Sequence, residues 1–581
     1  MKSQRLLVDF VRAKWYIYAS GIAFTAAANM IQSYFPHLLG RFTDQLQEGG
    51  LTQSAVIDYS LMLLGVGVSY GLLGGIGQFH IMYVGRLFEF FTRKRLFDHF
   101  TALSEHFYSK FGVGKLLSYV MNDVTSVRES ISMGINQTAN AIFLLLSAVT
   151  MMLFSSIPLY LIGACVVPLL FIPWIVVRFG PLIRKRSLAV QESLGTMTES
   201  AEEQFGGIRV TKKFAVETIM NGRFGKTVDQ IRDNQLKLVR VSSFFQSLIP
   251  FLGALSLVIT IIFGGYLTLN AKMSLGNFVA LTLYIRMMVN PLQQIGNVIN
   301  TMQRSRASLE RLNDLFAMKP DIEEIEQSTE LDFHQSAIRI KDLSFSYPDA
   351  KQEALHHINL TIEPGKTIGI VGKTGSGKTT LVKLLLRLYD STQGSIRIGD
   401  VDIHDLSLES LRGGIAYVPQ DGFLFSTTIR ENIAFFRRTA SLCQVEKAAK
   451  QAQIYGNIIE FPDKFETKLG ERGVTLSGGQ RQRTSLARGL IKNAPIMILD
   501  DSVSAVDSVT ERKIMDAIRA ERRQQTTILI AHRISALKYA DEIIVLDEGR
   551  IVQRGTHQAL LEQKGIYATL HAIQEEGSQH A

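Results

Sequence analysis

Long apolar segments are the feature that most limits how this chain can fold. A helix needs about 20 mainly apolar residues to cross the hydrocarbon core of a bilayer. Candidate spans of that kind occupy residues 15–40, 59–84, 138–157, 158–180, 244–269 and 275–300. Two of the joins between consecutive spans leave room only for tight turns, at residues 155–158 and 270–272. The sequence therefore predicts an α-helical membrane domain with six spans, within residues 1–320.

The placement of charge bears on topology and partners. The chain has 62 Lys and Arg residues against 53 Asp and Glu, a formal net charge of +9. A basic chain can indicate nucleic-acid binding. Here, however, many basic residues flank the apolar segments, as Lys14 and the run 93–95 do, and this is the pattern of cytoplasmic loops. We expect a multi-pass protein of the cell membrane with no nucleic-acid partner, which begins with an interfacial helix before residue 15.

Two long charged segments, residues 85–137 and 181–243, are predicted to be helices that extend into the cytoplasm. At a rise of 1.5 Å per residue, about 25 residues reach roughly 35–40 Å beyond the bilayer. Glycines at 112, 114, 206 and 207 mark the points where such helices can reverse. A plain loop between helices is the alternative.

Arg286 is a basic residue inside the last predicted span. On insertion scales a lipid-facing Arg at the centre of a span costs about 2.5–3.5 kcal/mol. Arg286 is therefore expected to face a cavity or another helix. A role in substrate binding or gating and a structural or snorkelling role both remain open. The methionine and aromatic residues of the spans suit an adaptable apolar cavity, and ordinary lipid-facing and packing roles explain them equally well.

After a linker at 321–337, residues 338–581 have the pattern of an α/β domain. A phosphate-loop motif, G-x-x-x-x-G-K-[ST], follows a predicted strand at 367–371 and precedes a predicted helix at 381–388. Backbone N–H groups of such a loop cradle phosphates, Lys378 is expected to contact the β- and γ-phosphates of ATP, and Thr379 is expected to hold Mg²⁺. The predicted nucleotide-binding residues here are Gly372, Lys373, Thr374, Gly375, Ser376, Gly377, Lys378, Thr379 and Thr380.

A second apolar strand, residues 496–500, ends in Asp500. In P-loop enzymes a carboxylate in this position helps to bind the metal. We therefore predict Mg²⁺ ligation by Asp500 together with Thr379.

Residues 338–565 resemble the ATP-binding cassette of ABC transporters, with the motifs in the family's order. The resemblance implies that Tyr347 stacks on adenine, that Gln420 reaches Mg²⁺ and the attacking water, and that His532 contacts the γ-phosphate. The sequence LSGGQ at 476–480 matches the family signature and is predicted to open a helix at 480–490. The membrane half resembles exporters more weakly, through its intracellular loops.

The signature implies a dimer. In the family, the residues corresponding to Ser477, Gly478, Gly479 and Gln480 cap an ATP held on the opposite cassette. Since one chain supplies one cassette, the expected partner is a second ABC half-transporter.

Asp501 departs from the family pattern, which has glutamate after Asp500. Its carboxylate is shorter by one carbon–carbon bond, about 1.5 Å, and misplacing a catalytic group by about 1 Å can cost on the order of 100-fold in rate. We interpret Asp501 as a weakened catalytic residue, so that the chain hydrolyses its own ATP slowly and pairs with a different chain that retains the glutamate. The alternative is that a backbone shift restores the geometry.

Several functions fit this pattern. The leading interpretation is ATP-dependent export of hydrophobic or amphipathic compounds of the multidrug type. A dedicated lipid or peptide exporter, a homodimeric exporter and an ATP-gated channel are the alternatives. Import is disfavoured because importers usually keep the two domain types on separate chains.

Overall fold

The computed structural model describes residues 6–322, 324 and 331–579. They form two units, one of residues up to 101 with 112–319 and one of residues 102–111 with those from 320 onward. Residues 323 and 325–330 of the predicted linker lie outside the described residues. The membrane unit is the first of the two and the cassette unit is the second.

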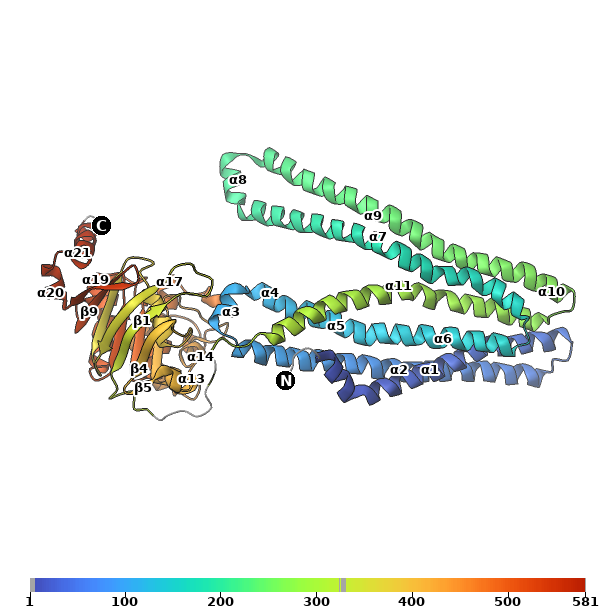
Figure 1. Cartoon of the computed structure of the whole chain (residues 1–581), viewed down its shortest axis with the longest axis horizontal. Coiled ribbons are helices and arrows are strands. Elements are labelled where there is room, and N and C mark those ends of the chain that lie inside the picture. The colour runs from blue at the N-terminus through green and yellow to red at the C-terminus, as the bar shows by residue number, and fades with distance from the viewer. Residues whose placement is uncertain (1–5, 323, 325–330, 580–581) are drawn as a thin grey trace. The chain divides into compact units, whose positions relative to one another are not determined.

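Long helices that run side by side make up the membrane unit (Figure 1). The long and short helices of this unit are α1 (Leu6–Gln47), α2 (Gln53–Ala102), α4 (Val113–Ser118), α5 (Val124–Glu129), α6 (Ile135–Phe154), α7 (Leu159–Gly206), α8 (Ile208–Phe214), α9 (Glu217–Ile259), α10 (Gly265–Leu269) and α11 (Leu275–Ala317). Short π-helical turns at 119–123, 130–134 and 260–264 connect consecutive helices. The short helix α8 joins α7 to α9, which lie next to each other along their length.

Four of the described helices are long and apolar enough to cross a membrane: Gln53–Ala102, Val113–Phe154, Leu159–Gly206 and Glu217–Leu269. The predicted count of six spans is therefore not confirmed. The two remaining predicted spans, 15–40 and 275–300, lie in α1 and α11 and carry polar residues such as Asn29 and Arg286. In α1, Lys14 has non-helical angles (φ −123°, ψ 17°), so the helix bends where the first predicted span begins.

Two polar residues of α1 hydrogen-bond to side chains of a neighbouring helix. Asn29 donates from Nδ2 to Asn140 Oδ1 on α6 at 3.0 Å, and Ser33 donates to Ser147 Oγ at 2.6 Å. Tyr284 on α11 donates from its hydroxyl to the Ser33 carbonyl at 3.0 Å. Since buried polar groups are costly unless hydrogen-bonded, these contacts explain how α1 and α11 pack among the apolar helices despite their polarity.

Close helix crossings at glycine hold α1 against its neighbours. A Cβ atom at Gly276 of α11 would lie 2.0 Å from the Gly40 carbonyl oxygen of α1. At the same crossing, the Gly276 N–H donates to Asp44 Oδ1 at 2.6 Å. The crossing of α1 with α2 is similar, because a Cβ at Gly77 would lie 2.9 Å from the Gly21 carbonyl oxygen. Small residues allow such close backbone approach.

Two sheets form the frame of the cassette unit. The first is antiparallel, with strand order β2-β1-β4-β5, and the second has the order β10-β9-β3-β8-β7-β6. In the second sheet β9, β3, β8, β7 and β6 are parallel, and β10 pairs antiparallel with β9. The strands are β1 (Ile338–Phe345), β2 (Leu355–Ile362), β3 (Thr367–Gly372), β4 (Gln393–Ile398), β5 (Val401–Asp402), β6 (Ile415–Val418), β7 (Ile496–Asp500), β8 (Thr526–Ile530), β9 (Glu542–Asp547) and β10 (Arg550–Gly555).

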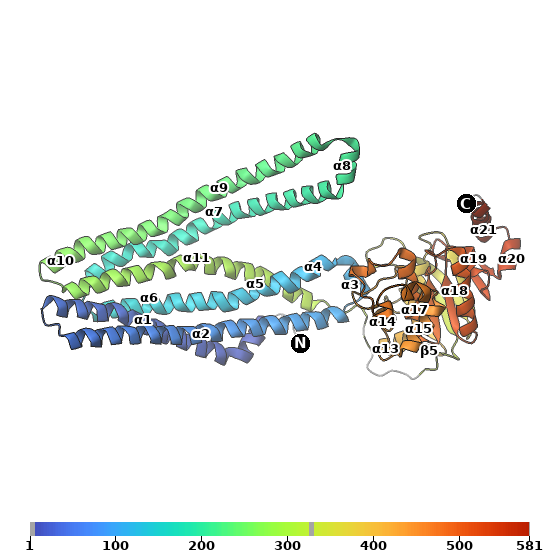
Figure 2. The ribbon, with the colours of Figure 1, turned by 180° about the vertical axis from the view of Figure 1, so that it is seen from behind.

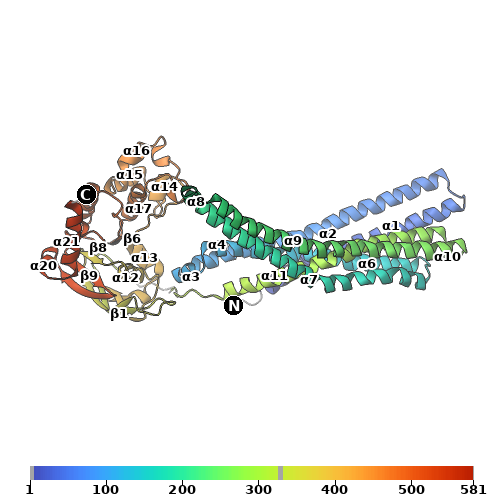
Figure 3. The ribbon, with the colours of Figure 1, turned by 90° about the horizontal axis from the view of Figure 1, so that it is seen from above.

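Helices complete the cassette unit, with α17 and α18 seen from behind in Figure 2 and α14 to α17 gathered on one side in Figure 3. They are α3 (Glu105–Lys110), α12 (Lys378–Leu385), α13 (Leu408–Gly414), α14 (Ile429–Ile433), α15 (Leu442–Gln451), α16 (Tyr455–Ile459), α17 (Gly478–Lys492), α18 (Ser508–Glu521), α19 (Ile534–Leu537), α20 (His557–Glu562) and α21 (Ile566–Gln579). Two apolar clusters, one on each side of β3, β7 and β8, pack these elements together.

Two helices of the cassette unit differ from the sequence prediction in their boundaries. The helix after the phosphate loop begins at Lys378 rather than at 381, because Gly377 takes a left-handed conformation and starts it, and it ends at Leu385, before Arg387 with φ 47°. The signature helix begins at Gly478 rather than at Gln480, because Ser477 caps it two residues earlier.

Candidate nucleotide-binding site

The predicted site residues gather at one edge of the parallel sheet. The adjacent strands β3, β8, β7 and β6 run in the same direction, so their carboxyl ends lie together. Gly372 ends β3 and Asp500 ends β7, while Gln420 and His532 follow β6 and β8 by two residues each. Ligands of open α/β sheets bind at this edge.

The phosphate loop is shaped by its glycines. Gly375 and Gly377 have φ values of +85° and +98°, in the left-handed region that favours glycine. At Gly372 a Cβ atom would lie 2.1 Å from the Leu546 carbonyl oxygen, so no side chain fits there. The loop leads directly into α12, whose N-terminal N–H groups attract an anion.

Lys378 is buried in the middle of this loop. Its Nζ donates to the carbonyl oxygens of Gly372 and Lys373, each at 2.8 Å. Burial lowers the pKa of Lys378, and the nearby Asp500 and Asp501 oppose that shift. A buried ammonium group beside the N–H donors of the loop suits a triphosphate. The phosphate oxygens would accept the hydrogen bonds that the carbonyl groups of Gly372 and Lys373 accept in this structure.

Asp500 is 3% exposed, and burial raises the pKa of its carboxyl group. The Thr379 hydroxyl and the Tyr417 hydroxyl, at 3.4 Å, both hydrogen-bond to it and oppose the rise. The structure thus brings together two of the three predicted Mg²⁺ ligands, Thr379 and Asp500, while the third, Gln420, hydrogen-bonds to the adjacent Asp501. Their hydroxyl and carboxylate oxygens are the hard donors that Mg²⁺ prefers. ATP and Mg²⁺ therefore fit the residues present.

Asp501 is hydrogen-bonded to the other two predicted catalytic residues, Gln420 and His532. Gln420 donates from Nε2 to Asp501 Oδ2 at 3.2 Å, and the backbone N–H of His532 donates to Asp501 Oδ1 at 3.4 Å. Asp501 itself has φ 46°, a left-handed conformation that aspartate tolerates better than most residues. Both carboxylate oxygens are turned toward groups of its own chain.

Gln482 is a residue that sequence reasoning missed. It is 5% exposed and lies in the signature helix α17. Its Nε2 donates to the Asp501 carbonyl oxygen at 2.9 Å and to Ser504 Oγ at 3.2 Å, and its Oε1 accepts from Ala505 N at 2.9 Å. Gln482 thus connects the signature helix to the Asp501 segment. The only signal in the sequence is a glutamine in the second turn of a helix, which does not identify this role.

Tyr347 lies beside the phosphate loop, with its hydroxyl 3.1 Å from Thr380 Oγ1. Its ring makes edge contacts with Phe345 and Tyr389. Lys383 lies 6.0 Å from the ring centre and forms an ion pair with Glu105 of α3. The predicted adenine-stacking residue is thus held by a cluster that also includes α3.

The signature residues form an N-terminal cap. Ser477 Oγ accepts from Gln480 N, and Gln480 Oε1 accepts from Ser477 N at 2.9 Å, the reciprocal pattern of a capping box. Ser477 and Gly478 are exposed. Within the described ranges, no hydrogen bond joins residues 477–480 to the phosphate loop at 372–380.

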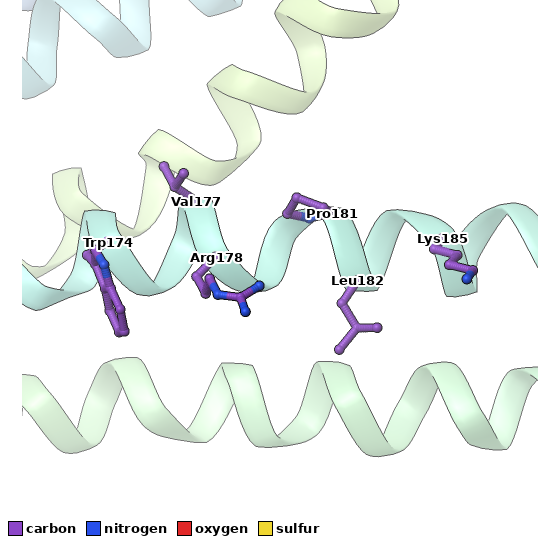
Figure 4. Close-up of a pocket in the computed structure, with 6 residues that line it drawn as sticks. All are labelled: Trp174, Val177, Arg178, Pro181, Leu182 and Lys185. Atoms are coloured by element: carbon purple, nitrogen blue, oxygen red, sulfur yellow. The ribbon is translucent and has the colours of Figure 1, made fainter.

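Two surface cavities lie among the described residues of the membrane unit. One, of about 420 Å³, is lined by six residues of α7, and Figure 4 shows Trp174, Arg178 and Leu182 extending from that helix toward α9. The other, of about 430 Å³, lies between α1, α2 and α11 and includes Arg286 and Asn290 in its lining.

Comparison with known proteins gives the same organisation. The family described as the ABC transporter transmembrane region matches residues 18–292, and the family described as ABC transporter matches residues 355–504. A probable multidrug resistance ABC transporter ATP-binding/permease protein of Bacillus subtilis (strain 168) is 34% identical over 572 residues, 97% of this chain and 96% of the relative.

Two further comparisons cover nearly the whole chain. An ATP-dependent lipid A-core flippase of Thiobacillus denitrificans (strain ATCC 25259 / T1) is 34% identical over 98% of this chain and 97% of its own length. The structure of a bacterial Atm1-family ABC exporter with ATP bound aligns with a TM-score of 0.78 and 26% identity, over 97% of this chain and 98% of the exporter chain. The chain therefore belongs to the ABC transporter family, as an exporter-type half-transporter in which a transmembrane region is fused to one cassette that couples ATP hydrolysis to transport.

Proposed function

We propose that this chain is one half of a heterodimeric exporter that moves hydrophobic or amphipathic compounds out across the cell membrane. In this proposal the cassette lies in the cytoplasm and binds ATP with Mg²⁺. The residues named above hold the phosphates and the metal, and the partner is a half-transporter with glutamate at the position of Asp501. The multidrug relative supports this substrate class.

The observation that carries the proposal is the division of the nucleotide site. The phosphate loop, Asp500 and Asp501 meet at one sheet edge, whereas the exposed cap at Ser477 makes no hydrogen bond to that loop in the part of the chain that the structure describes. An exposed helix N-terminus with free N–H groups is an anion site. We assign it to the ATP that the partner cassette binds.

Asp501 supports the asymmetry of the pair. Its two carboxylate oxygens are hydrogen-bonded to Gln420 and to the backbone N–H of His532, which keeps the short side chain against its own strand ends. A base in this position must reach the water that attacks the γ-phosphate. We infer slow hydrolysis at this site and faster hydrolysis at the site that the partner's loop forms with residues 477–480.

The experiment compares the full-length chain alone with the chain co-purified with its partner half-transporter, each reconstituted in lipid vesicles. We expect weak ATPase activity from the chain alone. The pair should show strong activity, together with ATP-dependent movement of an amphipathic dye such as Hoechst 33342. Vigorous, cooperative hydrolysis by the chain alone would refute the asymmetry and leave the homodimeric exporter as the better description.

A lipid flippase is the second candidate, because several relatives are named as ATP-dependent lipid A-core flippases. Fluorescent lipid in the same vesicles distinguishes the two functions. Transport of lipid without transport of the dye would favour this candidate.

A further inference from the structure

The cavity between α1, α2 and α11 combines a charge with an apolar wall. Aromatic and apolar residues of α1, α2 and α11 line it, including Phe35, Tyr70 and Met287. Arg286, Asn290 and Gln32 supply nitrogen donors to the same cavity. Its volume of about 430 Å³ is in the range of small-molecule sites.

The depth of Arg286 makes its charge significant. Helix α11 begins at Leu275, six residues after the apolar helix that ends at Leu269, so the two helices meet at the same end of the unit. Arg286 lies eleven residues further along, about 16 Å at 1.5 Å per residue. That distance is about half of a hydrocarbon core roughly 30 Å thick.

No Asp or Glu in the described part of the chain forms an ion pair with Arg286. The three helix segments around the cavity, residues 15–40, 59–84 and 275–300, contain no Asp and no Glu, and Arg286 is their only Lys or Arg. Asp44 lies beyond these segments and accepts the Gly276 N–H instead. Among the described residues no ion pair involves Arg286. An unpaired guanidinium at mid-membrane depth is unfavourable in free energy. An anionic ligand that neutralises the guanidinium therefore gains more binding free energy than a neutral ligand does.

We propose that this cavity binds the anionic end of an amphipathic substrate, with Arg286 as the counter-ion and Asn290 and Gln32 as further donors. The inference rests on the proposed export function and narrows its substrate class to amphipathic anions, such as alkyl phosphates or carboxylates. The planar guanidinium suits the paired oxygens of such groups. The apolar wall holds the hydrocarbon part.

The test uses two probes with the same alkyl chain and opposite charge, dodecyl phosphate and dodecyltrimethylammonium. The full-length chain, in the assembly that it forms, is reconstituted in phosphatidylcholine nanodiscs. Binding is measured from the ligand-induced shift of thermal unfolding and from stimulation of ATPase activity, below the concentrations that dissolve the discs. We expect the phosphate to bind the wild-type protein more tightly than the cation.

Three variants test whether the binding of dodecyl phosphate depends on Arg286. Arg286→Met should weaken dodecyl phosphate by about 10- to 100-fold, the loss expected for one charge-assisted contact. Arg286→Lys keeps the charge and should lose only a small part of the affinity. Arg304→Met removes another exposed arginine of α11 that is not among the lining residues, and it should leave the affinity unchanged.

Several results would overturn the inference. Equal binding of the two probes by the wild-type protein, no binding of either, or an Arg286→Met variant with wild-type affinity for dodecyl phosphate would each do so. If Arg286 instead pairs with an acid of the partner subunit, Arg286→Met would destabilise the assembly without changing that affinity. Failure of the proposed function gives a different result, in which Arg286-dependent binding persists but ATP drives neither probe across vesicles.

Discussion

Replacing Asp501 with glutamate tests the chemistry of the nucleotide site most directly. The added methylene group extends the carboxylate by about 1.5 Å. At present Asp501 Oδ2 lies 3.2 Å from Gln420 Nε2, within hydrogen-bond distance of its own strand ends. If the reach of the side chain limits the reaction, Asp501→Glu should raise ATP turnover at this site by about 10- to 100-fold, the penalty associated with a misplacement of about 1 Å.

The backbone at 501 adds a second expected effect. Asp501 has φ 46°, a conformation that the short side chain of aspartate tolerates better than glutamate does. A non-glycine residue held in the left-handed region costs on the order of 1–3 kcal/mol. Glu548 adopts φ 44° in the same cassette, so glutamate can take this conformation without preventing folding. We therefore expect Asp501→Glu to increase turnover while it slightly lowers the thermal unfolding temperature.

The assay is steady-state phosphate release by the full-length chain in nanodiscs with saturating Mg²⁺ and ATP, together with a nucleotide-binding measurement. Asp501→Asn is the matched control, because it has the same size but no basic carboxylate, and it should reduce turnover to background. Unchanged or lower turnover in Asp501→Glu, with ATP binding intact, would refute the reasoning. Such a result would mean that the backbone already places Asp501 correctly or that another step limits the rate.

Three further predictions concern other parts of the chain. Asp500→Asn should raise the thermal stability of the nucleotide-free protein, because burial raises the pKa of Asp500 and thus disfavours its charged form. The same variant should lose the thermal stabilisation that Mg²⁺ with ATP gives the wild-type protein. A fall in the stability of the nucleotide-free protein would contradict this prediction. Gln482→Ala leaves the Ala505 N–H without its acceptor and removes one of the hydrogen bonds to the Asp501 carbonyl, which still accepts from Ser504. It should cost roughly 1–3 kcal/mol in denaturant unfolding of the cassette, whereas an unchanged transition would show that these bonds contribute nothing. Gly276→Ala places a Cβ atom 2.0 Å from the Gly40 carbonyl oxygen and should lower the stability of the membrane unit by about 1–3 kcal/mol. Gly265→Ala is the control, because its Cβ meets open space, and it should have little effect. Both variants are compared with the wild-type protein by thermal unfolding in detergent.

The sequence was most informative where chemistry depends on local order along the chain. The phosphate loop needs a strand before it and a helix after it, and both are contiguous with Gly372–Thr380, so the motif predicted this local arrangement directly. The same holds for Asp500 at the end of β7. The exact start of the helix after the phosphate loop was predicted wrongly. The beginning of α12 depends on the left-handed φ of Gly377, which the composition of the sequence does not reveal.

Contacts between distant segments were not predictable in this way. Gln482 is close to Asp501 only because α17 packs beside the end of β7, and nothing in the residues around 482 signals that packing. In the membrane unit, mean hydropathy selects helices by composition alone, and it does not register whether their polar residues hydrogen-bond to neighbouring helices. Helices α1 and α11 do not meet the apolar criterion, so the prediction of six spans stays unconfirmed, although the Tyr284 hydroxyl of α11 donates to the Ser33 carbonyl of α1.

Gln482 also connects the signature residues 477–480, proposed to act in the partner's nucleotide site, with Asp501 of the chain's own nucleotide site. It lies in the helix that residues 477–480 begin, and it hydrogen-bonds to the carbonyl of Asp501 and to the N–H of Ala505. A Cβ atom at Gly479 would lie 2.8 Å from the Ala505 carbonyl oxygen, so the signature also contacts this segment directly. In the proposed dimer the signature completes the partner's site, whereas Asp501 belongs to the chain's own site. A displacement of the Asp501 segment when ATP binds would therefore pass through Gln482 to the surface that meets the partner's ATP, which gives a slowly hydrolysed nucleotide a structural route to influence the faster site.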